Sequence, residues 1–505
     1  MFYYKVISLR VFLLVLLVSN LSFAQLEVLG ITTTASQLTE ALEVTDPPSE
    51  VICSVCACED GVVDCANRNI TSSFELTDWD GLARLNPITV DLSQNLLTTV
   101  TRISHLPIQS LNLSSCEIQK IEIATFTYLE DLRSLDLSRN KISTSNFNKM
   151  ILCGPLEKLT GPSSFKQMQN LSLAHNDLHS LPQDLFVYMD TLSSLDLSGN
   201  PLAYIDQVTM GAISDLVNLK RLALSSCELE TLPEGLLRRQ KKLRWLDISD
   251  NRFTTIPSVL QEAPKLVFLS LDRNPIQTIK EKNLLSKLTS LKELQICRMS
   301  RLQNITAGAL GGLTNLEILR LNYNPRLTNL SPDFLVWQDE DDEEQYPIIK
   351  ELYLNNNNLT NIDSHILDSW NELVIGDFSN NPYVCDCNSQ WMVDVLVPML
   401  ANFQEKSSEN LMVCKKPAHL RGQTFVMLHN SSRTLVCNEV EDLKEHTPAN
   451  LAIILGILIG VTCTFPLVLV LMLLWKKGYF AKYCSRKKTR KESYSGYDEG
   501  ENENL

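Results

Sequence analysis

The cysteines are the residues whose spacing points most directly to chemistry, and eight of the 14 form two clusters far apart in the chain. The first cluster consists of Cys53, Cys56, Cys58 and Cys65 and has the spacing C-x2-C-x-C-x6-C. The second cluster consists of Cys385, Cys387, Cys414 and Cys437. In an intracellular protein this spacing would suggest zinc, whereas in a secreted chain it suggests disulfides. Four cysteines allow three pairings, and the spacing does not choose among them.

The beginning of the chain favours disulfides. Two basic residues precede the apolar run Val11–Val18, and small residues stand at Ser22 and Ala24. This pattern predicts a secretory signal peptide over residues 1–24, because the apolar run is too short to span a membrane comfortably.

No arrangement of residues is typical of a catalytic site. His175 and His179 are four residues apart, but they span a repeat turn rather than a helix, so we expect no metal there. The sequence has no glycine-rich phosphate loop, serine nucleophile elbow or His-Glu-x-x-His motif. We therefore expect no enzyme activity, no cofactor and no metal.

The element that organises the chain is a repeated leucine pattern. Leu192–Leu202 matches L-x-x-L-x-L-x-x-N-x-L at every fixed position, which is the leucine-rich repeat consensus. Leu195 and Leu197 point to one face of a short strand and Asp196 to the other, while Asn200 can satisfy backbone groups in the following turn. The asparagine position recurs twelve times, at Asn95, Cys116, Asn140, Asn176, Asn200, Cys227, Asn251, Asn274, Met299, Asn324, Asn357 and Asn381.

This repetition predicts an α/β solenoid, a leucine-rich repeat horseshoe with a parallel concave sheet. Two repeats are longer than the rest, and we expect their insertions to bulge opposite the strands or from the repeat edges. The second insertion carries the acidic run Asp339–Glu344 before Tyr346. The run is either a solvated loop or a partner-binding patch, with Tyr346 sulfated or Ca²⁺ held weakly.

Several cysteines lie outside the two clusters. Cys116 and Cys227 take the asparagine position and are predicted to be buried thiols. Cys153 is unassigned, and Cys297 has the outward strand phase, so it is either exposed or buried by neighbouring loops. Met299 marks the ninth repeat as the weakest, where we expect a local irregularity.

The clusters at the two ends of the array resemble the cysteine-rich caps of extracellular leucine-rich repeat proteins. The resemblance covers residues 53–437 and includes Asn381–Cys387 followed by Trp391. It implies the pairs Cys53–Cys58, Cys56–Cys65, Cys385–Cys414 and Cys387–Cys437. The whole chain resembles single-pass type I membrane proteins of cell-surface adhesion and recognition, and also Toll-type and Slit-like ectodomains. It lacks the large intracellular domain of Toll receptors, so we expect no direct Toll-type signalling.

A second apolar segment follows the caps. Leu451–Trp475 has 25 residues without a charge and is followed by basic residues, which predicts a type I plasma-membrane protein with its N-terminal ectodomain outside. The predicted segments are a signal peptide (1–24), a flexible leader (25–52), an N-terminal cap (53–84), an array of about twelve repeats (85–383), a C-terminal cap (384–438), a stalk (439–450), a transmembrane helix (451–475) and a cytoplasmic tail (476–505).

Charge is divided unevenly among these segments. The chain carries −14, of which the signal peptide contributes +2 and the tail +3, which leaves −19 for residues 25–450. So acidic an ectodomain argues against binding nucleic acid through net charge.

The variable strand positions provide the candidate binding residues. The residue just before the second consensus leucine is, in order, Thr89, Ser110, Ser134, Asn170, Ser194, Arg221, Trp245, Phe268, Glu293, Ile318, Glu351 and Ile375. Trp245 and Phe268 should lie side by side beyond Arg221, with Arg320 and Tyr353 in the next column. Such residues form protein-binding hot spots. Alternatively, the two rings pack against each other or against the sheet edge.

Candidate modification sites occur outside and inside the membrane. Extracellular N-x-S/T sequons lie at Asn69, Asn112, Asn170, Asn304, Asn329, Asn358 and Asn430. Glycans at Asn112 and Asn170 would mask the early strands and direct a ligand to later repeats. In the tail, Cys484 is a candidate for palmitoylation, and Tyr494 and Tyr497 for phosphorylation.

Three functions fit this organisation. The first is a recognition or adhesion receptor that binds an extracellular protein on its concave face and signals only through recruited partners. The second is an accessory subunit that regulates a membrane protein or ion channel through the span and basic tail. The third is an innate-immune co-receptor. The expected partners are an extracellular protein ligand, another cell-surface protein or a second copy of the chain, and no nucleic acid.

Overall fold

The computed structural model describes residues 49–153, 165–280, 284–339, 341–370, 372–403, 411–437 and 447–478. The chain divides into two compact units, one ending at Arg433 and the other beginning at Thr434. The predicted signal peptide, most of the leader, residues 439–446 of the stalk and the tail sites Cys484, Tyr494 and Tyr497 lie outside the described residues.

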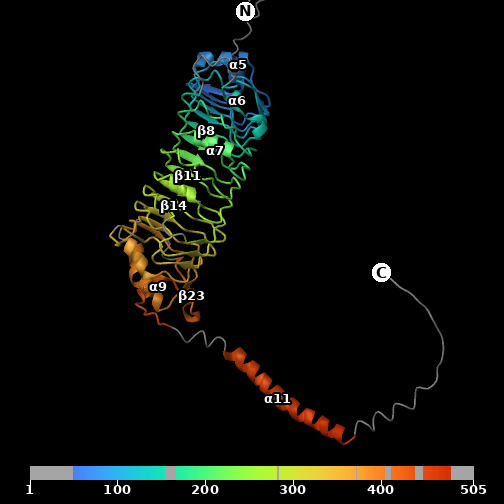
Figure 1. Cartoon of the computed structure of the whole chain (residues 1–505), viewed down its shortest axis with the longest axis vertical. Helices are drawn as coiled ribbons and strands as arrows, with labels where there is room; N and C mark the ends of the chain where they lie inside the picture. Colours follow the sequence, from blue (N-terminus) through green and yellow to red (C-terminus); the bar gives the residue numbers. More distant parts are fainter. Residues whose placement is uncertain are drawn as a thin grey trace, which may run out of the picture. The chain divides into compact units, whose positions relative to one another are not determined.

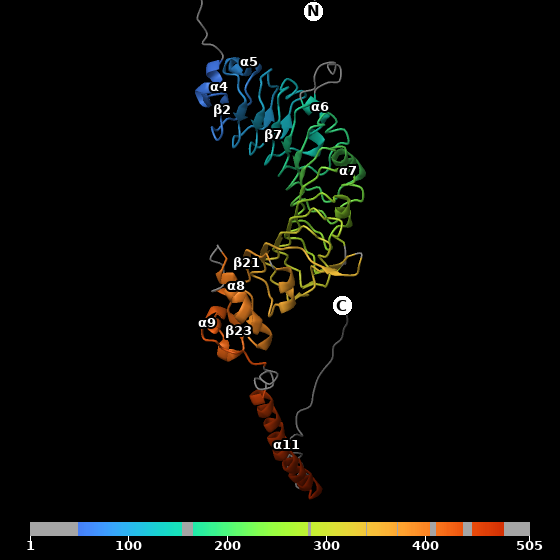
Figure 2. The ribbon, with the colours of Figure 1, turned by 90° about the vertical axis from the view of Figure 1, so that its left-hand side faces the viewer.

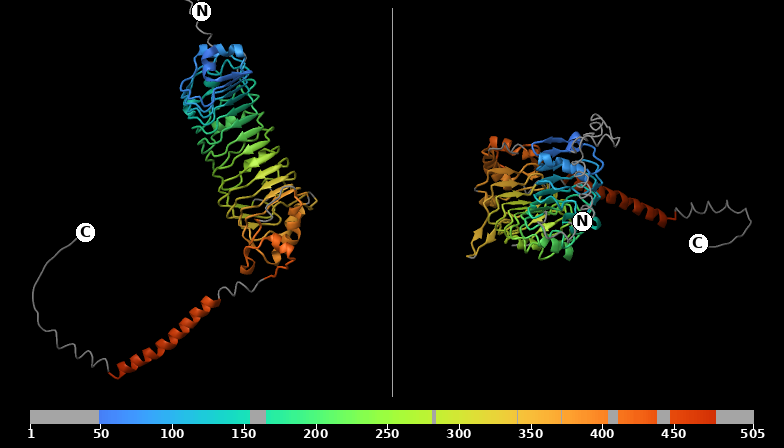
Figure 3. Two further views of the ribbon diagram at one scale, coloured as in Figure 1. Left: turned by 180° about the vertical axis from the view of Figure 1, so that it is seen from behind. Right: turned by 90° about the horizontal axis from the view of Figure 1, so that it is seen from above.

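The first unit is built on one large sheet in which each repeat contributes a three-residue strand. Its twelve parallel strands are β3 (Thr89–Asp91), β5 (Ser110–Asn112), β7 (Ser134–Asp136), β8 (Asn170–Ser172), β9 (Ser194–Asp196), β10 (Arg221–Ala223), β11 (Trp245–Asp247), β12 (Phe268–Ser270), β14 (Glu293–Gln295), β16 (Ile318–Arg320), β20 (Glu351–Tyr353) and β21 (Ile375–Asp377). They follow one another in chain order along the array (Figure 1; Figure 3). The solenoid predicted from the leucine spacing is therefore confirmed.

The strands line the inner side of the arc that this unit forms (Figure 2). The central residue of each strand is buried, as Leu195 and Leu246 are, and the two outer residues are left for the concave face. The outer side carries short strands, β4 (Thr99–Val100) with β6 (Lys120–Ile121), and β13 (Thr278–Ile279), β15 (Asn304–Ile305) and β17 (Asn329–Leu330). It also carries α6 (Lys149–Cys153), α7 (Gln207–Ser214), η3 (Thr144–Asn146), η5 (Ser258–Glu262) and η6 (Ser364–Ser369).

A ladder of buried asparagines joins the repeats. Asn140 is typical: its Nδ2 donates to the carbonyls of Leu113 and Leu137, and its Oδ1 accepts from the N–H groups of Cys116 and Ile118. One side chain thus satisfies buried backbone groups of two repeats. The residue before each ladder position has a positive φ in all twelve repeats, although only Gly199 is a glycine.

The three exceptions in the ladder behave differently. The thiols of Cys116 and Cys227 are free and buried, and they donate to the carbonyls of Leu92 and Leu197 at 3.0 and 3.3 Å. The irregularity expected at Met299 is absent from the sheet, where β12, β14 and β16 pair without a change of register. Met299 is buried, and its N–H finds an acceptor in Asn324 Oδ1 at 2.8 Å, which keeps the ladder in step.

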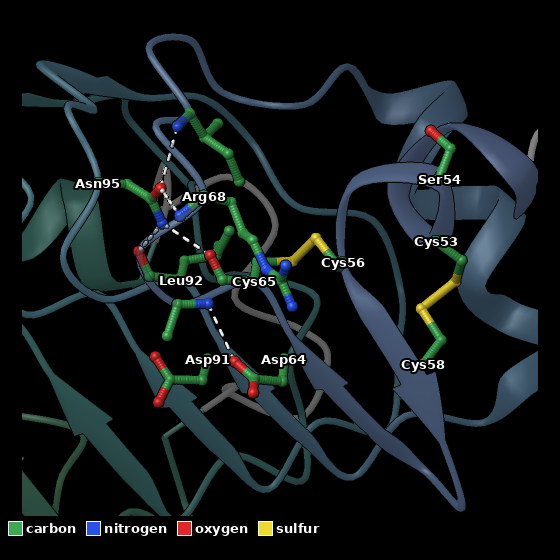
Figure 4. Close-up of a disulfide and its surroundings, with 12 residues drawn as sticks. Cys53, Ser54, Cys56, Cys58, Asp64, Cys65, Arg68, Asp91, Leu92 and Asn95 are labelled. Carbon is green, nitrogen blue, oxygen red and sulfur yellow. Dashed lines mark hydrogen bonds between the residues drawn. A yellow bond between two sulfur atoms is a disulfide. The ribbon is translucent and has the colours of Figure 1, made fainter.

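The N-terminal cap closes the first repeat. It comprises α4 (Ser49–Val55), the hairpin β1 (Ala57–Glu59) and β2 (Val62–Asp64), α5 (Leu76–Gly81) and η2 (Leu82–Leu85), and β2 extends the large sheet beside β3. Cys53 bonds Cys58, and Cys56 bonds Cys65, as the resemblance implied (Figure 4). Asn95 donates to the Cys65 carbonyl, which ties cap to array (Figure 4).

Helix α4 begins four residues before the predicted cap boundary at Cys53. The reason is burial: Ile52 is inaccessible to solvent and belongs to the core. Residues 49–52, predicted as flexible leader, are therefore part of the cap.

The C-terminal cap covers the last repeat with aromatic side chains. It contains β22 (Tyr383–Val384), β23 (Cys414–Lys416), α8 (Val397–Ala401), α9 (Phe425–Asn430), η7 (Cys387–Ser389), η10 (Ala418–Leu420) and a π-helical turn, η8 (Met392–Leu396). The rings of the buried Tyr383 and Phe425 lie 5.3 Å apart. Cys385 bonds Cys414, and Cys387 and Cys437 are both disulfide-bonded.

The acidic insertion forms a hairpin on the outer side of the arc (Figure 2). Its strands are β18 (Trp337–Gln338) and β19 (Glu344–Gln345), and Asp339 Oδ1 accepts from the N–H groups of Asp341 and Glu343. Over the described part of the chain, no three His, Cys, Asp or Glu side chains are grouped so that they could hold a metal.

The second unit contains one long helix, α11 (Thr447–Lys476). Within it, Leu455–Lys476 is long and apolar enough to cross a membrane. The helix begins before the predicted span and includes the last four residues of the predicted stalk. Thr447 and Pro448 open it, in keeping with the preference for proline in a first helical turn.

Candidate protein-binding surface

The structure places the candidate residues in the columns that the repeat spacing predicted. Arg221, Trp245 and Phe268 are register partners on β10, β11 and β12, and Arg320 is the partner of Tyr353 on β16 and β20. These five side chains fall into two groups along the sheet. Three of them lie on β10–β12 and two on β16 and β20, and Glu293 on β14, the strand between, pairs with Arg320.

The first cluster is the Trp245 stack, made of Arg221, Trp245 and Phe268. The two rings are parallel, with centroids 5.1 Å apart and planes inclined by 7°. The guanidinium carbon of Arg221 lies 4.1 Å from the Trp245 centroid on the next strand. Both rings are half-buried and Arg221 is exposed. The rings therefore pack against each other, as the alternative interpretation expected, while remaining accessible from the concave side.

The second cluster is the Arg320 clamp, made of Glu293, Arg320, Glu351 and Tyr353. Arg320 lies 3.2 Å from Glu293 and 3.5 Å from Glu351, and 4.3 Å from the Tyr353 ring centroid. Burial opposes the charge of Arg320, but the hydrogen bond to Glu293 and the neighbouring Tyr353 outweigh it and raise the pKa of the guanidinium. The charge of Arg320 is therefore already paired with carboxylates inside the clamp.

A row of polar side chains follows the strands beside the clamp. Asp272 Oδ1 accepts from the Cys297 N–H at 2.7 Å, and the Cys297 thiol donates to Asn322 Oδ1 at 2.8 Å. Burial and the nearby Asp272 raise the pKa of the thiol to about 12. Cys297 is therefore a buried thiol despite its outward phase, because the neighbouring turns cover it.

Sequence reasoning missed the row of cations that precedes the strands. Lys220 and Arg244 are exposed and stand in adjacent repeats, since the Arg244 N–H donates to the Lys220 carbonyl at 2.9 Å. The repeat register could have revealed them, because each directly precedes a residue of the predicted column.

The predicted glycosylation sites are spread over several faces. Asn69, Asn170, Asn329 and Asn430 are exposed, and Asn112, Asn304 and Asn358 are half-buried. Asn304 and Asn329 are register partners on the outer-side strands β15 and β17. Asn112 Nδ2 donates to Asp91 Oδ2 at 3.0 Å on the concave face.

Comparison with protein families agrees with this architecture. A leucine-rich repeat region model matches residues 186–373, and a leucine rich repeat model matches residues 107–159. The chain is a leucine-rich repeat protein. Its parallel sheet and the disulfides at both ends of the array agree with this fold.

Among known proteins, this leucine-rich repeat chain is similar to osteomodulin from Bos taurus, with 27% identity over 262 residues, 52% of this chain and 54% of osteomodulin. It is similar to the transforming growth factor beta activator LRRC33 from Danio rerio, with 30% identity over 220 residues, 38% of this chain and 30% of that protein. The chain thus spans about half the length, or less, of these curated relatives.

Among solved structures, the chain is similar to an internalin from Listeria monocytogenes. It is 19% identical, with a TM-score of 0.45, and the match covers 67% of this chain and 88% of the internalin chain.

Proposed function

We propose that this leucine-rich repeat protein is a cell-surface recognition or adhesion receptor that binds an extracellular protein through the Trp245 stack. The observation that carries the proposal is the accessible pair of aromatic rings on a concave column whose other members are polar except Ile318 and Ile375. Half-buried aromatic and arginine side chains of this kind dominate the binding energy of protein interfaces. The zebrafish relative is named as the activator of a growth factor, which supports a protein as the class of ligand.

The same proposal sets the location and topology. The ectodomain lies outside the plasma membrane, α11 crosses it as a type I span, and the tail lies in the cytoplasm and signals only through recruited partners. Disulfide-bonded caps support an oxidising compartment, and the apolar segment of α11 supports an anchor. Glycans at Asn304 and Asn329 would occupy the outer side, on strands other than those of the Trp245 stack.

The test is cell adhesion with the full-length chain. Cells displaying it are scored for adhesion to a panel of cell lines, including cells that express the chain itself. We expect adhesion to at least one line and a loss of tenfold or more for Trp245→Ala with Phe268→Ala. Ser110→Ala with Ser134→Ala, in the same column, is the matched control and should adhere normally.

Surface level is measured by flow cytometry, so that loss of folding is distinguished from loss of binding. Adhesion that survives the double aromatic change would show that the stack is not the site. Adhesion to no line would move the function to the membrane span and tail, as in the accessory-subunit hypothesis.

A further inference from the structure

The Trp245 ring has both of its faces covered. Arg221 lies over one face at 4.1 Å from the centroid, and Phe268 is stacked on the other at 5.1 Å. At Trp245 the stack therefore offers a ring edge, not an open face, to a partner on the concave side. Aromatic edges carry positive partial charge. A sugar ring, which stacks on an open aromatic face, finds none at Trp245.

Exposed cations stand at the beginning of the strands that carry the stack. Lys220 and Arg244 occupy adjacent positions just before β10 and β11, and Arg221 begins β10. Among the described side chains, none of these three forms an ion pair with a carboxylate, whereas the nearby Arg238 and Arg239 pair with Glu262 and Asp215.

In later repeats, the lysines that directly precede the strands are paired with a carboxylate. Lys292 and Lys350 both contact Glu317, at 2.9 and 3.5 Å. The hydrogen bond from Lys292 is the main reason that the pKa of Glu317 is lowered. Because residues 25–450 carry −19, acidic partners for cations are abundant in this chain. The cations beside the stack have nevertheless been left without one.

Carboxylates lie at the opposite end of the strands from these cations. Asp196 and Asp247 stand two residues further along the sheet, and each uses one oxygen to accept the N–H of Ser198 or Ser249. An anion is therefore attracted toward the residues that precede the strands and repelled from the third strand position. The charges run across the sheet, so they set the orientation of a partner as well as its sign.

We infer that the protein bound at the Trp245 stack presents adjacent carboxylates to Lys220 and Arg244 and an apolar side chain to the edges of Trp245 and Phe268. This inference rests on the proposed function and specifies the chemistry of its ligand: an acidic segment of a protein. The covered faces of Trp245 favour it over a sulfated glycan, which would use the same cations without the rings.

The charge test uses the full-length chain on cells. Lys220→Gln with Arg244→Gln should reduce adhesion about tenfold, because two charge contacts are removed while the rings stay in place. Lys120→Gln with Lys415→Gln, two exposed cations elsewhere, is the matched control and should adhere normally. Adhesion of the first variant at the level of this control overturns the inference.

Coated beads identify the class of anion. One set carries a peptide that alternates leucine with aspartate and glutamate, the second carries the same peptide with asparagine and glutamine, and the third carries heparin. We expect capture of the acidic-peptide beads alone, dependent on both Lys220 and Trp245. Capture of heparin beads that needs Lys220 but not Trp245 would assign the cations to a glycan and overturn the inference.

The two proposals fail separately. If the aromatic double variant loses adhesion and the charge variant does not, the acidic partner is wrong and the receptor function stands. If the aromatic double variant adheres normally, the receptor function at the stack is wrong, whatever the charge variant does.

Discussion

The Trp245 stack and the Arg320 clamp use the same kinds of residue in opposite ways. Each places an arginine over an aromatic ring in a neighbouring strand, at 4.1 and 4.3 Å. In the clamp, however, Glu293 and Glu351 flank the arginine, and Tyr353 donates to Glu351 at 3.1 Å. In the stack, the register neighbours of Arg221 are Ser194 and Trp245, and no described carboxylate pairs with it. The clamp has satisfied its polar groups internally, whereas the stack keeps a free cation and ring edges for a partner.

The largest expected effect is a difference in cell adhesion between variants of the stack and variants of the clamp. Arg320→Ala with Tyr353→Ala should leave adhesion within twofold of the natural chain, because these groups already bind one another, while the aromatic double variant of the stack loses tenfold or more. Cell adhesion at equal surface level measures both. A loss at the clamp as large as at the stack would show that the interface extends over both clusters.

Substitutions in the clamp should lower the free energy of unfolding more than substitutions in the stack. Arg320→Ala leaves Glu293 and Glu351 without their shared cation, and we expect it to lower the free energy of unfolding by about 1 kcal/mol. Arg221→Ala removes an exposed side chain and should cost less than about 0.5 kcal/mol. Denaturant unfolding of the secreted ectodomain, residues 25–446, measures the difference. Equal costs for both variants would contradict the idea that only the clamp is internally satisfied.

The smallest effect concerns the thiol between the clusters. With its pKa raised to about 12, Cys297 stays protonated at pH 8.5 and should not react with iodoacetamide in the folded chain. Cys227, with its pKa also about 12, is the internal reference. Mass spectrometry of the alkylated ectodomain, with a denatured sample as control, measures this. Labelling of Cys297 but not Cys227 would show that the turns beside the clamp open.

The same shift gives a pH dependence with a definite sign. The ordinary pKa is 9.0, so above about pH 9 the unfolded chain releases thiol protons that the folded chain retains. The unfolded state then binds fewer protons, and the free energy of unfolding falls as the pH rises from about 9 to about 12. Unfolding curves of Cys297→Ala should show a weaker fall over that range.

The leucine spacing by itself determined the solenoid, its strand register and the neighbours in each column. A parallel stack repeats one geometry, so a position in one repeat identifies its counterpart in the next, and the spacing alone places Trp245 beside Phe268. The sequence also indicated which cysteines lie at the two ends of the array. It did not reveal that Met299 would leave the register unchanged, because that depended on Asn324 in the following repeat.

Only the tertiary structure decided how the side chains in adjacent columns share their charges. Arg221 and Arg320 look alike in the sequence, and what separates them is which carboxylates lie within reach across neighbouring strands. The burial of Cys297 and Ile52 likewise depends on turns and helices from other repeats or from the cap. Leucine periodicity specifies the backbone because burial of apolar groups is nondirectional and repeats identically, whereas ion pairs and ring contacts depend on distances of a few ångströms that periodicity does not encode.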